Sequence, residues 1–400
     1  MAERPSAIVM GLFDTGLGAV RSLGRAGVRV LGIDSDRAMP GFASRYCDAT
    51  ACPDPAKEPE ALVDALLEGG RGEGEPAVLL PTSDVFVQFL SRMRVRLAGR
   101  FRFALPEADV VEAILDKGKQ YELAASSGVP CPRTFAVKSM TGVAGVEGEV
   151  DYPAIVKPCV GQPWRQHFGG SLKGLRASNP AELRARCAEV FAAGLEVIVQ
   201  SIVPGPNANH FKVCAYIGSK GQTLALFTLR KIRQYPAEFG VGSLVESAHD
   251  PELAELGMRF FRAISYRGIG SIEFKRDERD GQLKLIELNP RLWQQNALAT
   301  ACGINFPLIQ YLDLTGQPVE PQTEFKAGVR WLDLMADFQA FWWYRRRSQL
   351  GLWRWVRSII RARSFATFAW DDPRPFLKNY GYGLKLLRAP AYMARARSER

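Results

Sequence analysis

The chain has 400 residues, of which 47% are hydrophobic and 24% charged, and its formal net charge is +10. This length predicts two or three domains with a substantial core, and the composition excludes a disordered chain. No apolar run reaches the roughly 18 residues that a membrane-spanning helix needs. The seven cysteines are scattered without a CxxC pair, which predicts reduced thiols in a cytoplasm rather than disulfides or a zinc cluster.

Residues 7 to 110 alternate between strand and helix patterns. Apolar runs predict strands at 7–13, 28–34 and 77–84, and a helical pattern follows each of them. Such alternation predicts a parallel sheet covered by helices. The glycine-rich turn GLFDTGLGAV could face an anion at a helix N-terminus, or its glycines could let the helix pack closely on the sheet. It is not a GxGxxG fingerprint, so a nicotinamide enzyme is only an alternative.

From residue 152 the pattern changes to strands that predict an antiparallel α+β region. The segment YPAIVKP is a short strand with Lys157 embedded in it, and a glycine-containing loop is predicted over residues 160–178. Two hairpins are predicted, one over residues 210–218 with 222–236 and one over residues 268–277 with 281–290.

The second hairpin carries an oxygen-rich cluster. Glu273 lies in its first strand and Glu287 in its second, and Asn289 shares a face with Glu287 because strand side chains alternate with a period of two. Two adjacent carboxylates repel each other unless a cation lies between them, and carboxylate and amide oxygens suit Mg²⁺. The simpler alternative is a pair of solvated acids.

Several basic residues could complete a phosphate site. An ammonium group in an apolar strand, as at Lys157, is costly unless it meets an anion, and Lys117 is a second candidate at a helix start. Arg230, Lys231 and Arg233 lie close together in LRKIRQYP and could bind a polyanion or a carboxylate. Each feature also has a simpler interpretation. A lysine in a strand can extend its ammonium group to water, and the three basic residues can form a solvated face.

The order of these pieces resembles the ATP-grasp superfamily over roughly residues 8 to 325. The matching segments are DKGKQYELAASSGVPCPRTF, YPAIVKP, the glycine loop, VIVQSIVPG, YRGIGSIEF and LIELNPR. The resemblance implies an α/β and α+β fold with three parts. These are a Rossmann-like domain over 1–110, a two-lobed ATP-grasp domain over 111–325 (small lobe about 115–198, large lobe about 199–325), and a basic, Trp-rich helical extension over 326–400.

The resemblance also implies residue roles. Lys117 and Lys157 would contact ATP phosphates, and Glu273, Glu287 and Asn289 would hold Mg²⁺, with Mn²⁺ as an alternative. Arg291 and Lys157 would act in catalysis, and Arg230, Lys231 and Arg233 would contact substrate. The remaining ATP contacts implied are the phosphate-loop residues Gly169, Gly170, Ser171 and Lys173 and the adenine-facing hinge Gln200, Ser201 and Ile202. Three positions depart from the pattern of many members, namely Gln200, Asn207 and Ser271.

The implied activity is an ATP-dependent ligase that activates a carboxylate as an acyl phosphate and joins it to an amine. The substrates would be small molecules, an amino acid among them, and the resemblance is to carboxylate–amine ligase and D-aspartate-ligase-like proteins. The alternatives are a non-catalytic ATP-binding regulatory protein on the same fold and a protein that binds membrane or nucleic acid through its basic tail.

The C-terminal tail needs its own explanation. From residue 341 onward there are 14 Lys and Arg against 3 Asp and Glu, together with five of the eight tryptophans. Written as a helix, the stretch near Leu352 places an apolar stripe beside arginines, as in helices that lie in a membrane interface. This predicts contact with the inner face of the membrane, where a lipid-linked acceptor would be available. The alternatives are a stripe that packs on the body and, less in keeping with the pattern, nucleic-acid binding.

Overall fold

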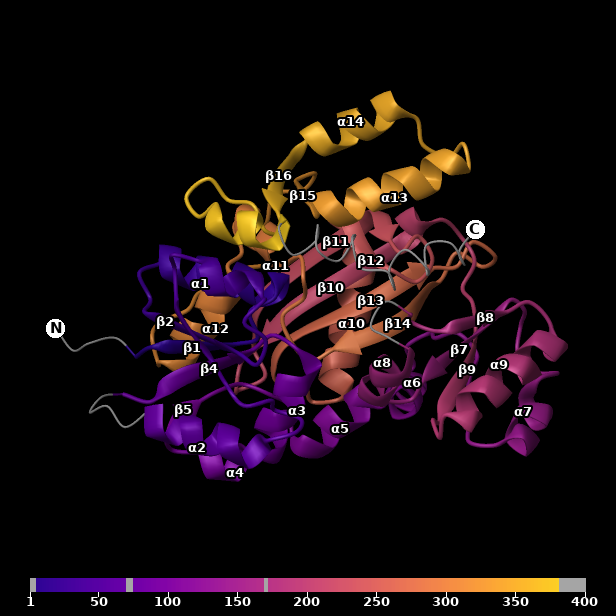
Figure 1. The fold of residues 1–400 in the computed structure, drawn as a ribbon, viewed down its shortest axis with the longest axis horizontal. Helices are drawn as coiled ribbons and strands as arrows, with labels where there is room; N and C mark the ends of the chain where they lie inside the picture. Colours follow the sequence, from indigo (N-terminus) through magenta and orange to yellow (C-terminus); the bar gives the residue numbers. More distant parts are fainter. Residues whose placement is uncertain (1–4, 70–74, 169–171, 381–400) are drawn as a thin grey trace. The chain divides into compact units, whose positions relative to one another are not determined.

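The computed structural model describes residues 5–69, 75–168 and 172–380. The chain divides into two compact units (Figure 1). The first comprises Met1–Ala104, Arg291–Glu320 and Ser364–Arg400, and the second comprises Leu105–Pro290 and Pro321–Arg363. The domain boundaries predicted at residues 110 and 325 remain predictions.

The first unit is built on the parallel sheet that the sequence predicts. Its strand order is β3-β2-β1-β4-β5, with every neighbouring pair parallel. The strands are β1 (Ala7–Met10), β2 (Val30–Asp34), β3 (Asp48–Ala51), β4 (Ala77–Pro81) and β5 (Phe101–Arg102). The helices are α1 (Asp14–Arg25), α2 (Pro59–Gly69), α3 (Asp84–Arg92), α4 (Arg94–Leu97), α11 (Asn296–Ala301) and α12 (Phe306–Leu314), with the 3₁₀ turn η1 (Pro40–Ala43).

The glycine-rich turn between β1 and α1 has a steric explanation. Gly11 has φ +99°, a backbone conformation that other residues rarely adopt. A Cβ on Gly16 would lie 1.8 Å from the Gly11 carbonyl oxygen, so only glycine lets α1 begin this close to the end of β1. Close packing of helix and strand therefore accounts for these two glycines.

The second unit contains a small antiparallel sheet in the order β6-β9-β7-β8. Its strands are β6 (Thr134–Val137), β7 (Ala154–Pro158), β8 (Leu175–Ala177) and β9 (Val197–Ser201), which α7 (Met140–Val146) and α9 (Pro180–Ala192) accompany. Asn179 caps α9 by accepting a hydrogen bond from the Glu182 amide. The prediction of a continuous loop over 160–178 was wrong, because residues Gly161–Phe168 form α8. Trp164 of α8 is buried in the core of this lobe, and such burial favours the helix.

The large sheet, which belongs to the second unit except for the last two residues of β16, has seven strands in the order β14-β13-β10-β11-β12-β15-β16. The strands are β10 (His210–Ile217), β11 (Thr223–Tyr235), β12 (Val241–Ser247), β13 (Gly268–Arg276), β14 (Leu283–Asn289), β15 (Arg330–Leu332) and β16 (Ala362–Phe365), with the 3₁₀ turn η2 (Asn207–Asn209) before β10. Both predicted hairpins are confirmed, as β10 with β11 and β13 with β14. The helices α5 (Ala108–Leu115), α6 (Lys117–Ser126) and α10 (Pro251–Ala263) contribute side chains to its main apolar core.

The C-terminal extension adds two helices, α13 (Leu334–Arg346) and α14 (Leu352–Ile360), to the second unit. Figure 1 draws α13 next to β11 and β12, and α14 beyond α13. Phe341 of α13 is buried and stacks on Trp355 of α14 at 4.7 Å between ring centres. None of the helices in the described part of the chain is long and apolar enough to cross a bilayer. All seven cysteines are free thiols.

Candidate active site

The two predicted metal ligands face each other across a hairpin. In the register of β13 and β14, Glu273 pairs directly with Glu287, and Ser271 pairs with Asn289. Directly paired residues lie on the same face of a sheet at close range. The structure therefore gathers the two carboxylates and the Asn289 amide on one face, although the metal-binding role of these residues remains a prediction.

Glu273 lies between two lysines from the neighbouring strands. Its carboxylate is 3.1 Å from Lys212 Nζ of β10 and 3.0 Å from Lys231 Nζ of β11, and both lysines are only 6% exposed. Burial by itself would raise the pKa of Glu273, but the two ammonium groups outweigh it and hold this pKa well below its ordinary value. Glu273 is therefore ionised throughout the physiological range.

Glu287 is held from the other side by helix α6. Lys117, at the first position of α6, forms an ion pair with Glu287. The neighbouring Gln120 donates to the Leu288 carbonyl and accepts from the Leu288 amide, and Tyr121 donates to the Ile286 carbonyl. Three consecutive residues of β14 are therefore fixed to one turn of α6, which orients the Glu287 side chain toward Lys117.

Lys157 lies in β7 of the small lobe and donates to Gln200 Oε1 at 2.8 Å. Burial, and after it the nearby Lys117, lower the pKa of Lys157 to about 8, although Glu287 and Glu273 act in the opposite direction. Gln200 is neutral, so it holds the ammonium group without compensating its charge. An anion would fill that role, as expected of a phosphate-binding lysine.

The donor set fits magnesium and a polyphosphate. Four lysines (Lys117, Lys157, Lys212 and Lys231) surround two glutamates, so the cluster carries excess positive charge. Glu273, Glu287 and Asn289 supply the hard oxygens that Mg²⁺ prefers. Ser271 Oγ on the same face is buried and has no hydrogen-bond partner within the described residues, as expected where a polar ligand is to be accommodated. The described residues contain no group of three or more His, Cys, Asp or Glu side chains that could hold a metal, and the metal-ligand role of Asn289 remains a prediction.

The predicted adenine hinge follows the end of β9. The Ser201 amide donates to the Arg133 carbonyl, and the Ile202 amide donates to the Pro153 carbonyl. Both amides are thus committed inside the protein, and Gln200, only 2% exposed, bonds Thr134 and Lys157. Their role in binding adenine remains a prediction. Lys173 is exposed, and Gly169, Gly170 and Ser171 lie outside the described residues.

The three basic residues of β11 have different partners rather than one common target. Arg230 pairs with Glu246, a residue that also binds Arg330, whereas Lys231 points to the opposite face and binds Glu273. Arg233 is buried and makes a two-bond contact with Asp337 of α13 at 2.9 and 2.8 Å. Contact of these three residues with substrate remains a prediction. In this structure the Arg233 guanidinium forms its ion pair with Asp337.

Arg291 belongs to the first unit, whereas Asn289, two residues earlier, ends β14 in the second. Its Nε donates to the Asp84 carboxylate at 2.6 Å, at the start of α3. The predicted catalytic role of Arg291 remains a prediction.

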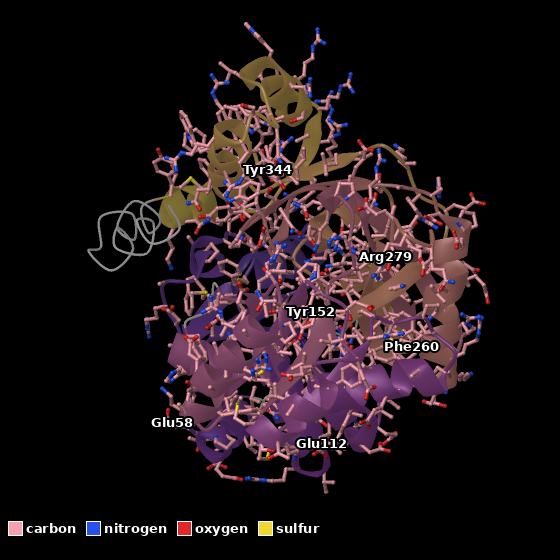
Figure 2. The ribbon with its side chains drawn as sticks, turned by 90° about the vertical axis from the view of Figure 1, so that its right-hand side faces the viewer. Glu58, Glu112, Tyr152, Phe260, Arg279 and Tyr344 are labelled. Carbon is pink, nitrogen blue, oxygen red and sulfur yellow. The ribbon has the colours of Figure 1, made fainter. Side chains whose placement is uncertain are left out.

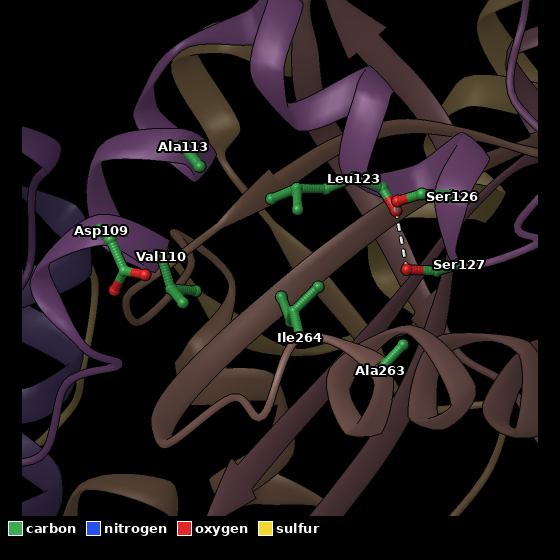
Figure 3. A pocket seen from close by; sticks show the side chains of 8 residues that line it. All are labelled: Asp109, Val110, Ala113, Leu123, Ser126, Ser127, Ala263 and Ile264. Carbon is green, nitrogen blue, oxygen red and sulfur yellow. Dashed lines mark hydrogen bonds between the residues drawn. The ribbon is translucent and has the colours of Figure 1, made fainter.

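Sequence reasoning missed Lys212, although the signal was present. In HFKVCAYI this lysine interrupts an apolar strand in the same way that Lys157 interrupts YPAIVKP. Asn207, which departs from the superfamily pattern, donates to the Tyr344 hydroxyl of α13 and accepts from Gln234. Figure 2 labels Tyr344 on this helix. A separate pocket of about 300 Å³ between α5, α6 and α10 contains none of the predicted site residues (Figure 3).

Sequence comparison relates this chain to proteins that include known ligases. Residues 116–311 match the family model described as the carbamoyl-phosphate synthase L chain, ATP-binding domain. D-aspartate ligase of Enterococcus faecium is 23% identical over 282 residues, which span 68% of this chain and 67% of that protein. The carbamoyl phosphate synthase large chain of Neisseria meningitidis is 25% identical over 268 residues, which span 63% of this chain but 22% of that protein.

Solved structures share the fold at low sequence identity. N5-carboxyaminoimidazole synthetase of Staphylococcus aureus has a TM-score of 0.63 at 15% identity, with 82% of each chain covered. A biotin carboxylase–ATP analogue complex from Campylobacter jejuni has a TM-score of 0.63 at 19% identity, with 81% of this chain and 74% of that chain covered. The family match identifies an ATP-grasp domain that includes residues 116–311, and the solved structures share the fold over about four fifths of the chain.

Proposed function

We propose that this protein is an ATP-dependent carboxylate–amine ligase. The observation that carries the proposal is the cluster of four lysines around Glu273 and Glu287, because it combines a metal-binding oxygen set with excess positive charge. The likeness to D-aspartate ligase supports an amino acid as one of the two substrates. The free cysteines fit the reducing cytoplasm in which we expect the protein to work.

The reaction needs charge neutralisation more than a covalent residue. A substrate carboxylate oxygen bonds to the γ-phosphorus of ATP while the bond to the bridging oxygen breaks, giving an acyl phosphate and ADP. The amine nitrogen then attacks the carbonyl carbon, the carbon–oxygen bond to phosphate breaks, and the nitrogen loses a proton. Glu273, Glu287 and Asn289 would hold magnesium, which would supply positive charge to offset the charge of the phosphates.

The residues of this chain take separate parts in that scheme. Glu273, Glu287 and Asn289 would hold the metal. Lys117 and Lys157 would bind the phosphates. Lys157 is suited to this role because Gln200, to which it donates, is uncharged and leaves the charge of the ammonium group for an anion. Lys231 and Lys212 keep Glu273 ionised, so that it can act as a metal ligand at any pH near neutrality.

Substrate recognition belongs to the same proposal. Arg230 would contact an acidic substrate, Arg291 would contact phosphate, and Gln200 to Ile202 would face adenine. Gly169, Gly170, Ser171 and Lys173 would cover the phosphates. A lipid-linked acceptor would require the protein to reach a membrane surface, which is considered separately below.

The test is ADP release with Mg²⁺-ATP against a panel of carboxylates and amino acids, with the ligated product identified by mass spectrometry. We expect one acid–amine pair to stimulate release, and Glu287→Ala to lower kcat by about 10²- to 10³-fold. Glu252→Ala, which removes an exposed acid of α10, is the matched control and should behave as wild type.

Two outcomes would count against the proposal. ATP binding without turnover on any pair, with and without envelope extract, would favour a regulatory ATP-binding protein. Turnover that is unchanged in Glu287→Ala would show that the chemistry occurs at another site.

A further inference from the structure

The strongest unexplained feature outside the proposed active site is α14. None of its nine residues is buried, although six of them are large and apolar. Taking 3.6 residues per turn, Leu352, Trp353, Val356, Ile359 and Ile360 occupy an arc of roughly 120° on the helix. Trp353 is 81% exposed, Ile360 67% and Leu352 49%. An exposed tryptophan beside exposed aliphatic side chains usually marks an interaction surface.

The adjoining arc of α14 is basic. Arg354, Arg357 and Arg361 follow the Trp353 edge of the apolar arc on the helix, and all three are exposed. Figure 2 shows nitrogen-tipped side chains projecting from this part of the ribbon. Apolar and cationic side chains therefore form neighbouring bands along one short helix.

The third side of α14 fastens it to the body of the second unit. Trp355 donates from Nε1 to Asp337 at 2.8 Å, and the Ser358 hydroxyl accepts from Arg233 of β11 at 2.8 Å. The Ser358 carbonyl also accepts from Arg330 of β15. Because polar bonds hold this side in place, the apolar and basic bands face outward on a fixed support.

Helix α13 extends the same kind of surface. Leu334, Phe338 and Trp342 recur every four residues along it and are 42%, 46% and 47% exposed. Arg345 and Arg346 follow at its C-terminal end and are exposed. The Phe338 ring also lies 6.2 Å from the Trp355 ring of α14, so the two helices adjoin here.

We propose that α13 and α14 dock this protein on an anionic membrane surface. The apolar band would enter the boundary between headgroups and acyl chains while the arginines bind lipid phosphates, which is the arrangement of helices that lie in an interface. This inference does not depend on the ligase activity. It would, however, bring β11, the strand that carries both Arg233 and Lys231, to a surface where lipid-linked substrates are found.

The combination of charge and apolar side chains favours a bilayer over nucleic acid or a second copy of this chain as the partner of α13 and α14. Nucleic acid would satisfy the arginines but would gain little from Leu352 and Ile360, because its outer surface is phosphate and sugar. A second copy packed through a two-fold axis would place the same surface against itself and would set arginine against arginine. An anionic bilayer is complementary to both bands at once.

The test is flotation of the full-length protein with vesicles of phosphatidylglycerol and phosphatidylcholine in equal parts, against vesicles of phosphatidylcholine alone. We expect binding to the anionic vesicles that weakens as salt rises from about 0.05 M to about 1 M. Each arginine near the surface contributes roughly fivefold to partitioning, so Arg354→Glu/Arg357→Glu/Arg361→Glu should lower binding by at least about a hundredfold. Leu352→Ser/Trp353→Ser/Ile360→Ser should lower it by at least about tenfold.

A matched control separates this surface from net charge. Arg184→Glu/Arg186→Glu/Arg262→Glu changes the net charge by the same amount at exposed positions of α9 and α10, and we expect it to bind nearly as wild type. Hydrogen exchange with and without vesicles gives a second measurement that needs no variant. Protection should appear in residues 352–361 and be absent from α9.

Several results would overturn the inference. Vesicle binding that survives both α14 variants, or that the control variant loses equally, would place the contact elsewhere in the chain. Absence of vesicle binding would exclude the membrane directly. Salt-sensitive binding to a DNA or RNA oligonucleotide without vesicle binding, or a dimer that dissociates when Trp353 is replaced by Glu, would assign α14 to one of the other occupants.

Discussion

Two buried charge clusters begin two residues apart on β11, and they differ in chemistry and in balance. Lys231 shares Glu273 with Lys212, so this cluster has more cations than anions. Arg233 binds Asp337 in a matched pair with two parallel hydrogen bonds, and Asp337 also accepts from Ser243 and Trp355. A lysine carries its charge on a compact ammonium group at the end of a flexible chain, whereas the planar guanidinium of arginine can bind both oxygens of one carboxylate. The cluster in which lysines outnumber carboxylates lies at the proposed active site. The Arg233–Asp337 pair, in which the charges balance, instead holds the C-terminal helices on the sheet.

The largest expected effect is in the arginine cluster. Asp337→Asn leaves the Arg233 guanidinium buried without a counter-ion, and arginine cannot relieve this by losing a proton. We expect the free energy of unfolding, measured with urea, to fall by about 3–5 kcal/mol. Binding of ATP under conditions where the variant is folded should stay near the wild-type value.

A double variant sharpens this prediction. Adding Arg233→Met to Asp337→Asn removes the uncompensated charge, so part of the lost stability should return. A double variant that is less stable than Asp337→Asn would show that the cluster acts through packing rather than through charge.

The lysine cluster should respond less strongly. Glu273→Gln also leaves buried cations, but lysine can lower its pKa and shed a proton when buried. We expect a loss of roughly 2–3 kcal/mol in the free energy of unfolding. Unlike Asp337→Asn, this variant should also lose Mg²⁺ binding, which Mn²⁺ titration followed by electron paramagnetic resonance would report.

Acid titration gives an independent control on Glu273. Its pKa in the folded protein lies well below its ordinary value of 4.5, so it contributes stability above that value and loses the contribution as pH falls toward the folded pKa. The slope of stability against pH below about 4.5 should therefore be shallower in Glu273→Gln, by at most about 1.4 kcal/mol per pH unit. Equal slopes would mean that Glu273 is not held in its ionised form.

Lys157 should affect nucleotide affinity more than stability. Lys157→Met removes a charge-assisted bond to phosphate, which is worth about 1.5–3 kcal/mol, so the Kd for ATP at pH 7 should rise by roughly 10- to 100-fold. Because the pKa of Lys157 is lowered to about 8, the free protein loses this proton above pH 8 and must regain it to bind phosphate. Calorimetry should show wild-type affinity falling between pH 8 and 9, and no such fall from this group in Lys157→Met.

Arg230 should give the smallest change in stability. Its side chain is about half exposed, and Glu246 keeps Arg330 as a partner when Arg230 is removed. We expect Arg230→Ala to alter the free energy of unfolding by less than about 1 kcal/mol. If Arg230 contacts an acidic substrate, KM for that substrate will rise while the unfolding midpoint stays in place. A large loss of stability without a change in KM would reverse this assignment.

Local patterns in the sequence were enough to predict much of the architecture. Strand–helix alternation over residues 7–110 predicted the parallel sheet, and the period-two pattern around DERDG predicted the β13–β14 hairpin and hence the approach of Glu273 and Glu287. These predictions succeed because apolar periodicity and turn residues act over short distances along the chain. The prediction failed at α8, where burial of Trp164 favours a helix in a stretch that its glycines had suggested was a loop.

Only the tertiary structure decided what each charged residue faces. Lys231 and Arg233 look alike in LRKIRQYP, yet one meets Glu273 from 42 residues further along the chain and the other meets Asp337 from 104 residues further along. The sequence marks Lys212 as a lysine in an apolar strand, but the position of β10 between β11 and β13 decided that it faces Glu273. The sequence by itself determined the ATP-grasp pieces and their order. The pairing of buried charges depended on which strands and helices come together, because an ion pair between distant residues leaves no period in the sequence.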